Sequence, residues 1–146
     1  MNLWHFQRRL TNLLLGWAAA SIGVGLAVGR GDDAMRRGVG EQFAGWGVVN
    51  AIIAVIGRRG ASRRRSRPEA GAPEAVAGEK RMLSRLLWLN TGLDVLYVLG
   101  GRRVMRRRGA TNAHWRGRGL AIVMQGGFLF FFDLLNALAL RSVNSD

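Results

Sequence analysis

The hydrophobic residues of this chain fall into four long stretches that are almost free of charge. The stretches cover residues 10–29, 42–57, 86–101 and 119–140. The first two contain no charged residue, and the others contain one each, Asp94 and Asp133. A helix that crosses a membrane needs about 20 mostly apolar residues, with a range of roughly 17–25. The first and last stretches reach this length directly, and the middle two reach it if flanking residues extend them.

The pattern within the stretches separates a membrane protein from a soluble one. A soluble four-helix bundle carries charged residues along each outer face, and these stretches do not. We therefore predict an all-α polytopic membrane protein, a bundle of four transmembrane helices arranged as two helical hairpins. The single transmembrane domain covers residues 1–146. Its expected parts are hairpin one over 6–57, a basic flexible linker over 58–79 and hairpin two over 80–141.

A cleaved signal peptide is the alternative explanation for the first stretch. Arg8 and Arg9 precede it, as in the basic region of such peptides, and small residues follow. The apolar run continues to Gly29, however, further than a cleaved signal requires. We therefore expect a retained membrane helix.

Charge and composition narrow the possible functions. The 146 residues include 22 lysines and arginines against 9 acidic residues, a net charge of +13, and Lys80 is the only lysine. The basic residues lie between the apolar stretches, as membrane topology requires, so we expect contact with anionic lipids and not with nucleic acid. The absence of cysteine excludes a disulfide framework, a thiolate metal site and a cysteine nucleophile.

Polar residues inside the stretches form the candidate site. It comprises Asp94, Asp133, Asn90, Gln125, Asn50, Tyr97 and Asn136. Asn90, Asp94 and Tyr97 follow i, i+4, i+7 spacing and share one helix face. Asp94 lies at the middle of its stretch, and Asp133 lies roughly 5 Å from the middle of its own at 1.5 Å per residue. A charged Asp at the centre of a bilayer costs at least about 2.5–3.5 kcal/mol, so both carboxyls are expected to face inward and meet.

Small residues on the first stretch predict close helix packing. They form two rows spaced by four positions: Ser21, Gly25 and Gly29, and Ala19, Gly23 and Ala27. Rows of this kind let the backbones of two membrane helices approach each other. The first helix is therefore expected to lie centrally or at a subunit contact, in a homo-oligomer or a larger membrane complex.

Three hypotheses for function remain open. The first is a structural or accessory protein that acts through helix–helix contacts, with the intramembrane carboxyls as interhelical clamps. The second is a small proton- or cation-coupled transporter or channel that uses Asp94 and Asp133. The third is a lipid- or quinone-binding module. The two histidines, His5 and His114, are not spaced as a pair of metal ligands, so we expect no metal and no cofactor. The sequence contains no recognisable nucleophile–base pair and no phosphate-binding loop, so an enzyme is the less favoured interpretation.

Three short motifs lie in the second, third and fourth stretches. They are Gly45-Trp46-Gly47-Val48-Val49-Asn50, Leu93-Asp94-Val95-Leu96-Tyr97-Val98 with Gly100, and Gln125-Gly126-Gly127-Phe128-Leu129 with Phe132-Asp133. Together they resemble small bacterial four-helix membrane proteins of a domain-of-unknown-function family. The resemblance implies an integral protein of the bacterial inner membrane and gives no activity. From the basic residues at the span ends, and above all the basic linker, we predict that both termini are cytoplasmic.

Overall fold

The computed structural model describes residues 2–143, and four long α-helices account for most of this part of the chain. The helices are α1 (Leu3–Gly29), α2 (Ala34–Arg65), α3 (Pro73–Arg107) and α4 (Ala113–Ala139), with short 3-10 helices η1 (Pro68–Gly71) and η2 (Leu140–Ser142). Each uncharged stretch falls almost entirely within one long helix. The predicted all-α class is confirmed.

Short polar side chains fix where three of the four helices begin. The side chains of Asn2, Asp33 and Asn112 accept hydrogen bonds from the backbone N–H groups of His5, Arg36 and Trp115, respectively. These bonds satisfy donors that have no partner within the helix. α3 begins instead with Pro73, whose missing N–H costs nothing at that position.

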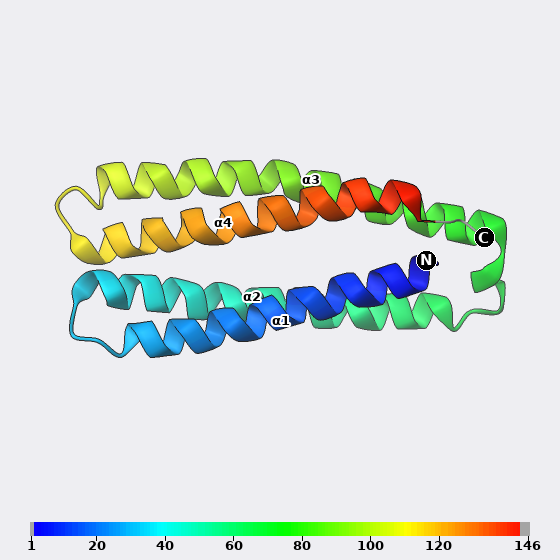
Figure 1. The fold of residues 1–146 in the computed structure, drawn as a ribbon, viewed down its shortest axis with the longest axis horizontal. Helices are drawn as coiled ribbons and strands as arrows, with labels where there is room; N and C mark the ends of the chain where they lie inside the picture. The colour runs from blue at the N-terminus through cyan, green and yellow to red at the C-terminus, as the bar shows by residue number, and fades with distance from the viewer. Residues whose placement is uncertain (1, 144–146) are drawn as a thin grey trace.

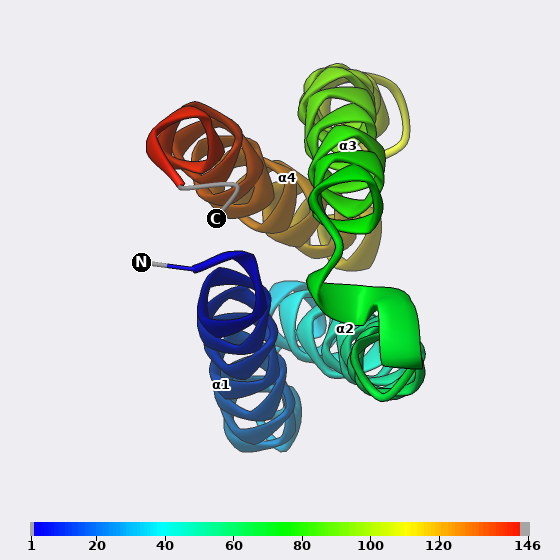
Figure 2. The ribbon, with the colours of Figure 1, turned by 90° about the vertical axis from the view of Figure 1, so that its right-hand side faces the viewer.

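The helices form two antiparallel hairpins, α1–α2 and α3–α4, which lie side by side (Figure 1). The turns of both hairpins lie at one end of the molecule, which we call the turn end. The two termini and the α2–α3 connection lie at the other, the terminal end. Viewed from the terminal end, each hairpin occupies one half of the array (Figure 2). The main contact between hairpins joins α2 to α4.

The connection between the hairpins is shorter than the expected linker over 58–79. α2 continues to Arg65 and α3 begins at Pro73, so only residues 66–72 lie between the two helices, and η1 is among them. Arginine is a good helix former, so a run of arginines does not end a helix. An ion pair between Arg64 and Glu79 also joins the two helices across this connection.

Glycines at the turn end bring helix backbones into direct contact. A side chain on Gly25 of α1 would meet the backbone of Ala44 and lie 2.7 Å from the carbonyl oxygen of Gly40, both in α2. Between the hairpins, Gly38 of α2 lies against the carbonyl group of His114 in α4. Only glycine leaves room for such approaches, so these positions close the array at this end.

An apolar cluster holds the helices together at the terminal end. Its buried members come from α1, α3, α4 and the residues that follow α4: Leu3, Phe6, Val76, Leu83, Leu87, Ala137, Leu140 and Val143. The helices are therefore held by glycine contacts at one end, and α1, α3 and α4 by large apolar side chains at the other.

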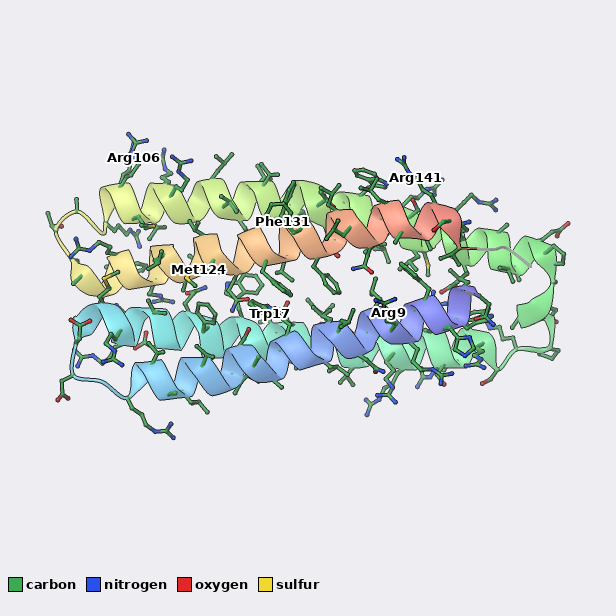
Figure 3. The ribbon with its side chains drawn as sticks, in the orientation of Figure 1. Arg9, Trp17, Arg106, Met124, Phe131 and Arg141 are labelled. Carbon is green, nitrogen blue, oxygen red and sulfur yellow. The ribbon has the colours of Figure 1, made fainter. Side chains whose placement is uncertain are left out.

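Three of the helices are long and apolar enough to cross a membrane: α1, α2 and α4 with its extension to Ser142. α3 does not meet the same measure, because its uncharged stretch is short and carries Asp94. Large apolar side chains are exposed along the middle of all four helices. In Figure 3, Arg106 lies at the turn end and Arg141 toward the terminal end, whereas Trp17, Met124 and Phe131 lie between them.

Candidate functional site

A cavity of about 350 Å³ lies among the four helices, between the glycine contacts and the apolar cluster. Most of its lining is apolar, from residues such as Leu14, Ile53, Leu87, Leu93 and Phe132. Its polar lining includes five of the seven predicted site residues: Asn50, Asn90, Asp94, Tyr97 and Asp133. The structure therefore brings five of the seven predicted residues to one shared cavity.

The two carboxyls lie in the wall of this cavity. Asp94 of α3 is 4% exposed and Asp133 of α4 is 7% exposed, and both residues line the cavity. Burying a carboxyl group is costly unless it is neutral, paired or hydrogen-bonded. The structure therefore places Asp94 and Asp133 in one shared lining, on the two helices of the same hairpin.

Three buried polar atoms of cavity-lining residues have no hydrogen-bond partner within the described residues. They are Oδ2 of Asp94, Nδ2 of Asn50 and Oε1 of Gln7. Asp94 and Asn50 are both 4% exposed. Buried polar groups are nearly always hydrogen-bonded, since leaving one unpaired costs about 1–3 kcal/mol. Asp94 thus offers a free acceptor to the cavity, and Asn50 offers a free donor.

The cavity opens sideways between α2 and α3. These two helices are not among the closely contacting pairs, in contrast to the helices within each hairpin. Cavity-lining side chains on both helices are exposed, among them Ile53, Leu86 and Tyr97, the last at 41%. The Tyr97 ring packs edge-on against Trp46 of α2, with ring centroids 4.8 Å apart. This opening faces outward along the apolar middle of the helices.

A charged cluster closes the cavity toward the terminal end. Arg64 of α2 makes three hydrogen bonds of 2.8–3.0 Å to the carboxylate of Glu79 in α3. Gln7 of α1 donates a further bond of 2.7 Å to the same carboxylate. The sequence pattern did not predict this cluster, because Arg64 and Glu79 both lie in the expected linker over 58–79. No periodicity in the sequence indicates that the two residues pair.

Gln125 and Asn136 lie outside the cavity lining. The side chain of Gln125 accepts a hydrogen bond from the Trp17 ring nitrogen and donates one to the hydroxyl of Ser21, so it joins α4 to α1. Asn136 donates to the backbone carbonyl of Phe132 in its own helix. The prediction that placed all seven polar residues in one site is therefore corrected at these two positions.

The two rows of small residues on α1 face different surroundings. Gly25 and Gly29 pack against α2, and Ser21 bonds to Gln125, so this row lies inside the array. The second row, Ala19, Gly23 and Ala27, is exposed, and a side chain on Gly23 would meet no atom within 4 Å. Only the first row packs helices within this chain.

Comparison with known proteins gives one match. The model of a family of unknown function, DUF6992, matches residues 13–134. The matched range contains Asn50, Asp94 and Asp133, and it agrees with the predicted resemblance to an uncharacterised domain. No curated protein and no solved structure matches the chain. Within the described residues, no group of three or more His, Cys, Asp or Glu side chains could hold a metal ion.

Proposed function

The chain belongs to DUF6992, a family of unknown function, so we infer its role from its own site. We propose that it is a four-helix integral membrane protein that binds a small membrane-soluble molecule. The molecule occupies the cavity beside Asp94 and Asp133. It has an apolar body and a small head group that both donates and accepts a hydrogen bond, as an alcohol or a quinol does.

The observation that carries the proposal is that two unpartnered polar atoms belong to residues that line a largely apolar cavity. Oδ2 of Asp94 requires a donor, and Nδ2 of Asn50 requires an acceptor. A hydroxyl group supplies both, and its apolar body covers the surrounding leucine and isoleucine side chains. The volume of about 350 Å³ lies within the usual range for small-molecule pockets, roughly 300–1,000 Å³.

The position of the opening supports entry from the lipid. In a membrane, the gap between α2 and α3 faces the acyl chains, so an apolar ligand reaches the carboxyl pair without crossing water. We propose that α3 is the fourth membrane helix in this arrangement. Its buried Asp94 faces the cavity, while Leu89 and Leu96, which are exposed, face lipid.

The same geometry favours binding over conduction. The cavity ends near Trp46 and Tyr97, and beyond them glycine contacts bring the backbones of neighbouring helices together. At the terminal end, the Arg64–Glu79 cluster closes the space among α1, α2 and α3. A channel or transporter needs access from both sides of the membrane.

A cavity-filling variant tests the proposal. Gly57 of α2 lines the cavity, and a β-carbon there would meet no atom within 4 Å, so Gly57→Phe adds an aromatic ring at the cavity without forcing the helix backbone to move. Gly45 is equally open but does not line the cavity, so Gly45→Phe is the matched control. Full-length protein is purified in mild detergent, extracted with organic solvent and analysed by mass spectrometry.

We expect wild type and Gly45→Phe to retain one small amphiphile in near-stoichiometric amount, and Gly57→Phe to lose it. Retention of the same molecule by all three proteins, or no retained molecule in wild type, would contradict the proposal.

A second candidate is the structural or accessory role, and the exposed row Ala19, Gly23 and Ala27 favours it. A row of small residues that faces lipid lets another membrane helix pack closely. If this row is an interface, Gly23→Leu dissociates the assembly seen by native mass spectrometry of the wild type. A wild type that is monomeric in several mild detergents and gives no crosslinked partner excludes this role.

A further inference from the structure

A second hollow, separate from the proposed binding cavity, lies at the terminal end between α1 and α2. Its volume is about 260 Å³. One wall is a face of α1 that carries Trp4 and Arg8, and the opposite wall is a face of α2 that carries Arg58, Ser62 and Arg65. The residues of each wall are spaced by three or four positions, so each wall is one continuous helix face.

The three arginines of this hollow carry uncompensated charge. Within residues 2–143, the only arginine–carboxylate ion pair joins Arg64 to Glu79, and it involves neither Arg8, Arg58 nor Arg65. Other arginines lie over tryptophan rings, such as Arg118 over Trp115, but these three do not. No acidic side chain lines the hollow. The three guanidinium groups that line the hollow therefore have their donors available.

The location of the hollow suits a membrane interface. It lies just beyond the uncharged stretch of α2, which ends at Gly57, and beside the first turns of α1. Trp4 is an amphipathic ring at the level where such rings anchor a protein to lipid headgroups.

We propose that this hollow binds the phosphate group of an anionic phospholipid. Arg8, Arg58 and Arg65 donate to the phosphate oxygens from two helices, since a guanidinium matches phosphate geometry with two parallel hydrogen bonds. The hydroxyl of Ser62 is a further donor, and Trp4 lies beside the glycerol backbone. The site holds α1 and α2 together at the end where glycine contacts are absent.

The inference does not depend on the proposed cavity ligand, although Gln7, Thr11 and Ala61 border both spaces. The test uses full-length protein in neutral detergent. Phosphatidylglycerol or phosphatidylcholine with the same acyl chains is titrated in, and bound lipid is counted by native mass spectrometry. The variant is Arg58→Gln/Arg65→Gln. The matched control is Arg59→Gln/Arg63→Gln, which removes the same charge from exposed positions of the same helix outside the hollow.

We expect wild type to prefer phosphatidylglycerol. Each arginine near a lipid phosphate contributes about a fivefold gain in affinity, so the variant should bind this lipid about 25-fold more weakly. The control should lose less than about twofold. Equal loss in variant and control, or no preference for the anionic lipid, would overturn the proposal. Displacement of the lipid by an equimolar amount of inorganic phosphate would also overturn it, because the ligand would then be free phosphate.

Circular dichroism of the variants checks that the helices are retained. If Arg58→Gln/Arg65→Gln does not fold, Arg8→Gln with Arg9→Gln as its control gives the same comparison on α1, because Arg9 does not line the hollow.

Discussion

The contact between Gly25 and α2 gives a prediction whose magnitude follows from atomic positions. A β-carbon on Gly25 would lie 2.7 Å from the carbonyl oxygen of Gly40 and against the backbone of Ala44. Backbone atoms cannot rotate away, so the helices must separate. Gly25→Ala should therefore destabilise the protein by the cost of overpacking, about 1–3 kcal/mol.

Gly23 provides the matched control, because it lies on the same helix and has open space around it. Replacing either glycine with alanine changes helix propensity by the same amount, up to about 1 kcal/mol, so this contribution cancels in the comparison. The difference in unfolding free energy between Gly25→Ala and Gly23→Ala should thus equal the steric cost.

The assay is unfolding of the purified protein by sodium dodecyl sulfate in mixed micelles, followed by circular dichroism. Gly25→Ala should unfold at lower dodecyl sulfate than Gly23→Ala, by about 1–3 kcal/mol in free energy. If the two variants agree within about 0.5 kcal/mol, α1 and α2 do not pack in the described register, and the reasoning is refuted.

Three further predictions concern other contacts. A double-mutant cycle of Arg64→Gln, Glu79→Gln and the double variant should give a coupling energy of about 1–3 kcal/mol in the same unfolding assay. A coupling energy near zero would mean that the ion pair does not form. Gln125→Leu should lower the free energy of unfolding by about 0.6–2 kcal/mol, because it removes the hydrogen bonds to Trp17 and Ser21 of α1. The same change in a Ser21→Ala background should lower it by less, and unchanged stability would mean that Gln125 does not bond to α1. Proteoliposomes that contain the protein should show no more proton flux than empty liposomes, and flux abolished by Asp133→Asn would instead support a transporter.

The sequence determined the helical architecture and part of the site, for identifiable reasons. Uncharged stretches located the four helices because apolar length alone marks such segments. The spacing of Asn90, Asp94 and Tyr97 placed them on one helix face, and all three line the cavity. Those features are local, so they could be predicted without tertiary contacts.

The remaining features depend on which helices meet. Gln125 bonds to α1 because α4 presents that part of its surface to Trp17 and Ser21, and no spacing within α4 contains this information. Glu79 is buried only because Arg64 and Gln7 converge on it from two other helices. The expected linker failed for the same reason, since composition does not reveal an ion pair across a chain connection.

The measurement that tests the account most directly compares wild type with Asp94→Asn in two readouts, thermal stability in detergent and the amount of retained amphiphile. The asparagine amide group can donate to the carboxylate of Asp133, so the contact between α3 and α4 persists. We expect Asp94→Asn to melt at the same temperature as wild type or higher and to retain about five- to tenfold less amphiphile, because its neutral amide oxygen is a weaker hydrogen-bond acceptor for the ligand than a carboxylate oxygen. A variant that melts substantially lower while it retains the wild-type amount of amphiphile would show that Asp94 is an interhelical clamp and not part of a binding site.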